Sequence, residues 1–200
     1  MDFSPLEEYL QQQVDSGVPG CELVVCRNGE ILFHSCAGFS DYEKTKPTSF
    51  EDRYMLYSCT KPMTATAAMQ CLQEGLFSLE DPVSKYLPAF ANAYLEENGA
   101  ARPPKEPITI RHLLTMTAGL NYSVGAPVLR EAKAQAGKDM TTGRFFQALM
   151  GQPLDFEPGS RWQYSLSHDV LAAVVEVIAG VATGAIAHGY LVAHILGKPF

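Results

Sequence analysis

Two runs of β-forming residues near the N-terminus meet at Asn28-Gly29 and set the first constraint on the fold. The stretch CELVVCRNGEILFHSCAG (21–38) is rich in Val, Leu, Ile and Phe on both sides of that dipeptide. Because Asn-Gly readily adopts the positive φ angles of a two-residue turn, residues 21–36 are predicted to form a β-hairpin. A hairpin is marginal alone and leaves both edges unpaired, so we expect it to belong to a larger sheet.

The rest of the chain is predicted to be mainly helical. Ser4 should cap a first helix, with Pro5 at its first position and Glu7 completing a capping box, and Gly17 should follow its end. Further helices are expected over 58–74, 109–116, 142–150 and 167–179. No strand is predicted after residue 57, so the strands that would complete the sheet are missing from the pattern. We therefore expect the chain to be a fragment of a longer protein.

Composition narrows the classes of partner. With 46% hydrophobic and 18% charged residues, the chain can bury a globular core. Its net charge of -7, without a Lys/Arg cluster, predicts no nucleic-acid partner. The apolar stretch 170–187 contains Glu176 and two glycines, which favours a core helix over a membrane span. The N-terminal MDFSPLEEYLQQQVDSG lacks a basic and apolar leader, so a cytoplasmic location is predicted.

Cysteine and histidine spacings give no sign of a metal site. The five cysteines are odd in number and contain no C-x-x-C pair, so neither a disulfide framework nor a zinc knuckle is predicted. We expect them to be reduced and mostly buried, including Cys59. The five histidines lack the H-x-x-x-H and H-E-x-x-H spacings. No metal and no other cofactor is expected.

The stretch LYSCTKPMTA (56–65) places Ser58 three residues before Lys61. Residues three apart on a helix lie on the same face, so Lys61 can reach Ser58 and help a hydroxyl that is a weak nucleophile at neutral pH. The positive end of the helix dipole would favour an alkoxide on Ser58 and a neutral, proton-accepting amine on Lys61. Alone, S-x-x-K more often marks a capping serine followed by a solvated lysine than a catalytic pair.

Three blocks in order give this pair a context: YSCTKPMTATAAMQCLQEGLFSLEDPVSKYLPAF (57–90), RHLLTMTAGL (111–120) and FEPGSRWQYS (156–165). Together they resemble the serine β-lactamase and penicillin-binding-protein superfamily, in the class C β-lactamase-like branch that includes serine esterases and DD-peptidase-like proteins. The first block is similar to that branch's nucleophile helix and L-D-D-P-V turn. The second is similar to its H-L-L-T-H-T-S-G-L stretch, and the third to the P-G-x-x-x-x-Y-S segment at its catalytic tyrosine.

The resemblance implies an α/β (α+β) fold of the β-lactamase/transpeptidase-like type, in which an antiparallel sheet flanked by helices accompanies an all-helical region. Residues 1–57 would supply the N-terminal helix and hairpin of the sheet domain. Residues 58–200 would supply the mainly helical region that carries the motifs. The two parts would form one incomplete catalytic unit, without the C-terminal strands of the sheet.

The resemblance also implies the roles of single residues. It makes Ser58 the acylated nucleophile, Lys61 its proton partner and Tyr164 the second member of the general-base pair. A phenol near a lysine ammonium has its phenolate favoured, so Lys61 and Tyr164 could share a proton. Tyr122 and Trp162 are candidate walls for the acyl group of a substrate. The implied activity is a serine hydrolase that acts on small esters or related acyl compounds.

Two of the departures from the family pattern affect the predicted substrate and the predicted activity. Leu166 stands where penicillin-recognising members have an asparagine that binds the substrate amide, which favours esters over the alternative, β-lactam or DD-peptidase substrates. The family's K-T-G or H-x-G strand, which supplies an oxyanion donor, has no counterpart before Phe200, and losing one donor costs about 10²–10³-fold in rate. We therefore expect the 200-residue chain to be inactive or nearly so. A non-catalytic relative that only binds a ligand or partner is the third alternative.

Overall fold

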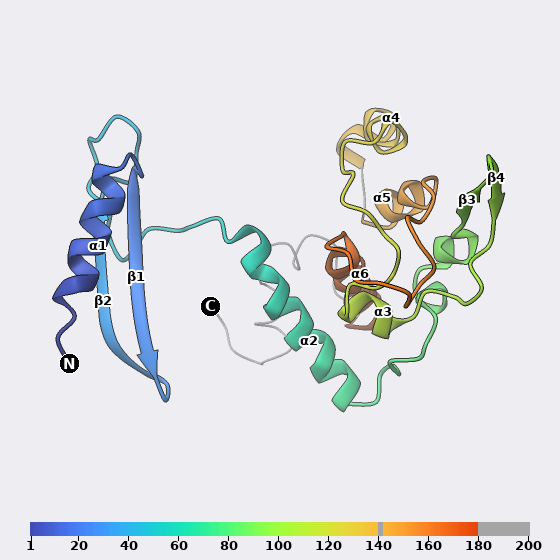
Figure 1. Ribbon diagram of the computed structural model, residues 1–200, viewed down its shortest axis with the longest axis horizontal. Coiled ribbons are helices and arrows are strands. Elements are labelled where there is room, and N and C mark those ends of the chain that lie inside the picture. The colour runs from blue at the N-terminus through green and yellow to red at the C-terminus, as the bar shows by residue number, and fades with distance from the viewer. Residues whose placement is uncertain (140–141, 180–200) are drawn as a thin grey trace. The chain divides into compact units, whose positions relative to one another are not determined.

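The structure is a computed structural model that describes residues 1–139 and 142–179. The chain divides into two compact units, Met1–Met55 and Leu56–Phe200 (Figure 1). The first unit holds one helix and a hairpin. The second holds most of the helices and all the residues predicted to act in catalysis.

The first unit confirms the predicted hairpin. Strands β1 (Gly20–Arg27) and β2 (Glu30–Gly38) pair antiparallel, and the turn between them is Asn28-Gly29, with φ angles of 53° and 83°. Helix α1 (Ser4–Asp15) lies along this hairpin (Figure 1). The Cys21 thiol donates a hydrogen bond to the backbone carbonyl of the buried Leu10 at 3.6 Å. The helix therefore covers one face of the hairpin.

The predicted capping box at the start of α1 is wrong. Ser4 is the first helical residue rather than the cap, and its side chain makes no capping hydrogen bond. Its backbone N–H and its hydroxyl both donate to the Asp2 carboxylate, at 3.0 and 2.8 Å. The cap position itself is occupied by Phe3, and the Asp2 carboxylate, a stronger acceptor than a hydroxyl, satisfies the first N–H of the helix.

The second unit contains four α-helices at or within the predicted positions: α2 (Lys61–Gln73), α3 (Ile110–Leu114), α5 (Thr142–Leu149) and α6 (Ser167–Ala179). The sequence pattern missed α4 (Pro127–Ala136). Short 3-10 turns complete this unit: η1 (Tyr57–Thr60), η2 (Val83–Lys85), η3 (Pro88–Asn92) and η4 (Gly137–Asp139).

The expectation that no strand follows residue 57 is also wrong. Strands β3 (Leu95–Glu97) and β4 (Ala100–Arg102) form a small antiparallel hairpin. Its turn is Asn98-Gly99, with φ angles of 54° and 79°, so it uses the same dipeptide as the first hairpin. The flanking strands are only three residues long and carry charged residues, which hid them from a search for apolar β-forming runs.

Helix α6 is the centre of the second unit and packs against α2, α3 and α5 (Figure 1). All residues from Val170 to Val175 are buried, and Ala67 and Ala68 of α2 are buried in the same cluster. The predicted core helix is confirmed over 167–179, while the remainder of the apolar stretch, 180–187, lies outside the described residues. Among the described helices, none combines the length and apolarity that crossing a membrane requires.

Backbone hydrogen bonds join the second and third motif blocks. Segment 115–121 accepts bonds from segment 155–166: Asp155 to Gly119 at 2.8 Å, Gly159 to Thr117 at 2.8 Å, Gln163 to Met116 at 3.0 Å and Leu166 to Asn121 at 3.2 Å. These bonds fix the loop that leads into α6. They therefore fix Tyr164, which lies on that loop.

Gly119 allows the two segments to approach closely. Its φ of +79° is in the left-handed region, and an added Cβ would overlap the carbonyl oxygen of Phe156. Gly75 provides a control, because its φ is +72° but an added Cβ there would meet no atom within 4 Å.

We predict that Gly119→Ala lowers the free energy of unfolding by about 2–5 kcal/mol, because about 1–2 kcal/mol of left-handed strain adds to about 1–3 kcal/mol of overpacking. Gly75→Ala should lose only the strain, about 1–2 kcal/mol. Urea unfolding measures both. Equal losses in the two variants would contradict the close approach at Gly119.

Candidate active site

Ser58 lies on the 3-10 turn η1, directly before α2 begins at Lys61. Residues three apart eclipse one another in a 3-10 turn, so the two side chains project to the same side. The backbone N–H of Lys61 donates to the carbonyl of Ser58 and closes this turn. The preceding residue, Tyr57, has a φ of +45°, an unfavourable conformation for an aromatic residue. The turn that presents Ser58 is therefore tighter than the predicted α-helical turn.

The structure brings together the three residues predicted to act in catalysis. The Ser58 hydroxyl lies 2.6 Å from the Tyr164 hydroxyl, and the Lys61 ammonium donates to Ser58 Oγ at 3.5 Å. Ser58 and Tyr164 are 106 residues apart in the chain. Their contact is made because α6 begins three residues after Tyr164 and packs against α2.

Local contacts hold Tyr164 in place. Its ring packs at a tilt against the ring of Tyr122, with centroids 5.4 Å apart. The next residue, Ser165, is buried, and its hydroxyl shares a hydrogen bond of 2.7 Å with that of Ser167 at the start of α6. The Tyr164 side chain itself is 40% exposed. A rigid backbone thus presents a phenol that solvent and small molecules can reach.

The pKa of Tyr164 is lowered from its ordinary value. The hydrogen bond with Ser58 is the largest cause, followed by the hydrogen bond with Lys61, and the positive charge of Lys61 adds to both. These contacts favour the phenolate. As a phenolate, Tyr164 would accept the hydrogen bond that the Ser58 hydroxyl donates, which is the arrangement of a base with its nucleophile.

The pKa of Lys61 is raised, contrary to the expectation of a neutral amine. Burial would lower it, but the hydrogen bond with Tyr164 and the charge of Asp169 outweigh burial. The expectation failed because it considered the helix dipole alone and no anionic partner. The raised pKa favours the ammonium form of Lys61.

The three predicted substrate-binding residues lie in different environments. Tyr122 is 47% exposed, and Lys61 Nζ lies 5.8 Å from the centre of its ring. Trp162 is 65% exposed on the loop before Tyr164. Leu166 is only 4% exposed and packs in the hydrophobic core, so the structure does not place its side chain on an open surface.

Asp169 is a site residue that the sequence reasoning missed. It lies in the first turn of α6, and its carboxylate is 4.0 Å from Lys61 Nζ. The only signal in the sequence is an acidic residue five positions after Tyr164. Its contact with Lys61 depends on how α6 packs against α2.

Among the described residues, neither Cys59 nor His168 makes a side-chain hydrogen bond with Ser58, Lys61 or Tyr164. Cys59 is exposed, which corrects the expectation of a buried thiol, because η1 buries none of its residues. Among the five cysteines only Cys71 is buried, so the expectation of mostly buried cysteines is wrong. His168 Nε2 lies 3.2 Å from the Leu114 carbonyl and ties α6 to α3.

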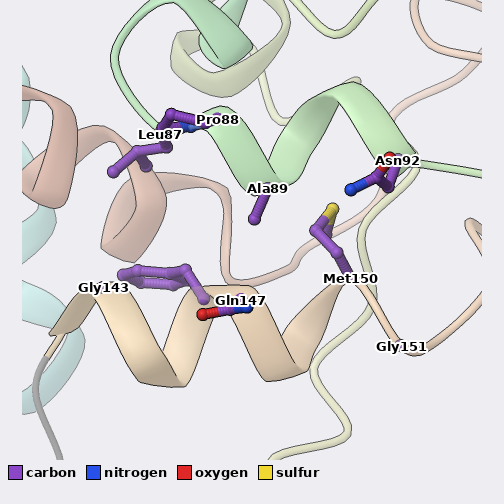
Figure 2. Close-up of a pocket in the computed structure, with 9 residues that line it drawn as sticks. Leu87, Pro88, Ala89, Asn92, Gly143, Gln147, Met150 and Gly151 are labelled. Carbon is purple, nitrogen blue, oxygen red and sulfur yellow. The ribbon is translucent and has the colours of Figure 1, made fainter.

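Within residues 1–139 and 142–179, no three His, Cys, Asp or Glu side chains are grouped so that they could hold a metal ion. A groove of about 660 Å³ lies elsewhere in the unit, between η3 and α5. Figure 2 shows Ala89 and Met150 pointing into it. Its lining includes none of the residues around Ser58.

Comparisons with known proteins identify the family of the chain. Residues 6–187 match the family model described as Beta-lactamase. The chain is 36% identical over 185 residues to Esterase EstB of Burkholderia gladioli, covering 89% of this chain and 45% of that protein. It is 30% identical over 192 residues to Lovastatin esterase of Penicillium rubens, covering 88% and 47%.

Among solved structures, EstCE1, described as a hydrolase with promiscuous acyltransferase activity, superposes with a TM-score of 0.77 at 33% identity. The match covers 96% of this chain and 50% of that one. The chain thus spans about half the length of the relatives that it matches. Its fold is that of the β-lactamase/transpeptidase-like proteins, and the chain belongs to the β-lactamase family, within the serine β-lactamase and penicillin-binding-protein superfamily.

Proposed function

We propose that this chain carries the nucleophile and the base of a serine hydrolase that acts on small esters or related acyl compounds through an acyl-enzyme on Ser58. The observation that carries the proposal is the contact of Ser58 Oγ with Tyr164 Oη at 2.6 Å and with Lys61 Nζ at 3.5 Å. Residues 1–57 and 58–200 would be parts of one catalytic unit. EstB and EstCE1 are about twice as long as this chain, so the activity is proposed for the whole protein that contains it.

In the acylation step, the Tyr164 phenolate takes the proton of the Ser58 hydroxyl while Oγ attacks the ester carbonyl. The Lys61 cation, 3.5 Å from Oγ, stabilises the negative charge that develops there. When the tetrahedral intermediate collapses, the carbon–oxygen bond to the alcohol breaks. The alcohol then leaves with the proton that Tyr164 had accepted.

Deacylation reverses these roles with water in place of the alcohol. The Tyr164 phenolate accepts a proton from the water, whose oxygen attacks the acyl carbon, and returns the proton to Ser58 Oγ as the acid leaves. Tyr164 is 40% exposed, so water can reach it. The backbone N–H of Ser58 is the proposed first donor to the carbonyl oxygen of the substrate.

Small esters are the proposed substrate class. Leu166 is buried in the core and offers no hydrogen bond to a substrate amide, so a site of this kind has little to hold a peptide or β-lactam amide. Two of the matched relatives are described as esterases. The alternatives are a β-lactamase or DD-peptidase activity and a non-catalytic chain that only binds a ligand or partner.

We predict that a fluorophosphonate forms a covalent adduct on the whole protein that contains this chain and that Ser58→Ala abolishes it. Tyr164→Phe should slow adduct formation by about 10²–10⁴-fold, because it removes the general base. Tyr122→Phe is the matched control, since its ring lies beside the same contacts, and it should label at close to the original rate. Intact mass against time measures all four proteins.

Two outcomes would contradict this assignment. An adduct that survives Ser58→Ala would place the nucleophile elsewhere. Equal slowing by Tyr164→Phe and Tyr122→Phe would mean that loss of either phenol perturbs the site, and Tyr164 would have no special part in proton transfer.

The pH dependence follows from the direction of the pKa shifts. Because the pKa of Tyr164 is lowered, its phenolate forms below the ordinary value near 10, and the labelling rate should rise with pH through that lowered pKa. Lys61→Met removes two of the causes that lower it, so the rising limb should move to higher pH. A limb that stays in place in Lys61→Met would show that Lys61 does not tune the base.

We predict that the whole protein that contains this chain prefers small esters to β-lactams. A p-nitrophenyl ester should be hydrolysed with a kcat/KM at least about 100-fold above that for a β-lactam, because no polar group at position 166 grips the amide. Parallel steady-state assays with both substrates measure the ratio. An equal or higher kcat/KM for the β-lactam would favour the penicillinase alternative.

A further inference from the structure

The Lys61 ammonium is enclosed by groups that compensate its charge only in part. The side chain is 14% exposed. The centres of the Tyr164 and Tyr122 rings lie 5.1 and 5.8 Å from Nζ, and Ser58 Oγ lies 3.5 Å away. Ring faces and a hydroxyl attract a cation, but a largely buried ammonium is costly without an anionic partner.

Asp169 provides that anion from a separate helix. Its carboxylate lies 4.0 Å from Lys61 Nζ, and the side chain is 46% exposed. Asp169 is in the first turn of α6, where the helix dipole favours a negative charge. Since α6 packs against α2, the packing of the two helices sets where the backbone of Asp169 lies relative to Lys61.

We infer that Asp169 is a positioning residue for the site, which anchors the Lys61 ammonium between the Ser58 hydroxyl and the Tyr164 phenol. This inference rests on the proposed function and adds to it a role for α6 beyond presenting Tyr164. Asp169 makes no contact with Ser58 or Tyr164 at hydrogen-bond distance among the described residues, so it acts through Lys61.

The charged and titratable groups around Asp169 come from three parts of the unit. Lys61 faces it from α2, His168 adjoins it on α6, and Tyr164 lies on the loop before that helix. Burial raises the pKa of Asp169, while the charge of Lys61 acts in the opposite direction. In turn, the charge of Asp169 raises the pKa of Lys61.

Asp169 affects the pKa of Tyr164 in two opposing ways. The direction in which that pKa moves when Asp169 is replaced therefore tests its role. Its own charge slightly raises the pKa of Tyr164, whereas the Lys61 contacts that it secures lower that pKa and are the larger influence. If Asp169 only contributes its charge, removing it lets Tyr164 ionise at lower pH. If it anchors Lys61, removing it weakens the Lys61 contacts, and Tyr164 ionises at higher pH.

The test is a titration of tyrosinate absorbance in Asp169→Asn, which keeps the shape of the side chain and removes its charge. The chain has nine tyrosines, so each protein is compared with the same protein carrying Tyr164→Phe, and the difference isolates Tyr164. We expect the Tyr164 midpoint to move to higher pH, by less than in Lys61→Met. Asp169→Glu should restore the original midpoint.

A matched control is Glu74→Gln, which removes one negative charge at the opposite end of α2 and should leave the Tyr164 midpoint unchanged. If Asp169→Asn does not fold, Asp169→Ser makes the same test, because it also removes the charge and serine is accepted at a helix start. A midpoint that stays in place or moves to lower pH in the neutral variant would overturn the inference.

Labelling separates this inference from the proposed function. The plateau rate of fluorophosphonate labelling should fall about 10- to 100-fold in Asp169→Asn, as expected when a catalytic group is misplaced. If the whole protein that contains this chain shows the midpoint shift but forms no Ser58 adduct, the role of Asp169 holds and the proposed function is contradicted. If Asp169→Asn in the whole protein labels at the original rate and shows no midpoint shift, the proposed function holds and the role of Asp169 is contradicted.

Discussion

The packing of α6 against α2 is the interaction on which the site depends. Helix α2 begins at Lys61, one 3-10 turn after Ser58, and α6 begins just after Tyr164, so this one contact sets the distance between groups 106 residues apart. The faces that meet are made of small and branched residues, with Ala67 and Ala68 of α2 buried beside the valines of α6. Small residues let the two helix backbones approach closely enough for the side chains at their N-termini to touch.

The charged groups near the N-termini of α2 and α6 shift the pKa values of Lys61 and Tyr164. Two helix starts create a positive potential, which by itself would favour a neutral amine. The structure instead surrounds the ammonium with the two rings of Tyr122 and Tyr164, the Ser58 hydroxyl and the Asp169 carboxylate, and the pKa of Lys61 is raised. A cation beside Tyr164 favours its phenolate. In the proposed mechanism, the proton moves between Tyr164 and Ser58, and Lys61 stabilises the negative charge.

Sequence patterns predicted the parts of this structure that local chemistry decides. The Asn28-Gly29 hairpin and five helices follow from turn dipeptides, caps and apolar periodicity, and the contact of Ser58, Lys61 and Tyr164 matches the resemblance of the three motif blocks. The β3–β4 hairpin was missed although Asn98-Gly99 marks it, because its strands are short and polar. The charge of Lys61 and the contact of Asp169 were beyond reach, since both depend on the packing of one helix against another.

The central claim is that Ser58 becomes acylated while Tyr164 takes its proton. The most direct test is to mix the whole protein that contains this chain with an activated acetate ester, quench with acid within the first turnover, and map the acetyl group by peptide mass spectrometry. The account predicts acetyl on Ser58, and much less of it at the same time point in Tyr164→Phe. Acetyl on Lys61 or Tyr164, or an equal yield on Ser58 in both proteins, would contradict it.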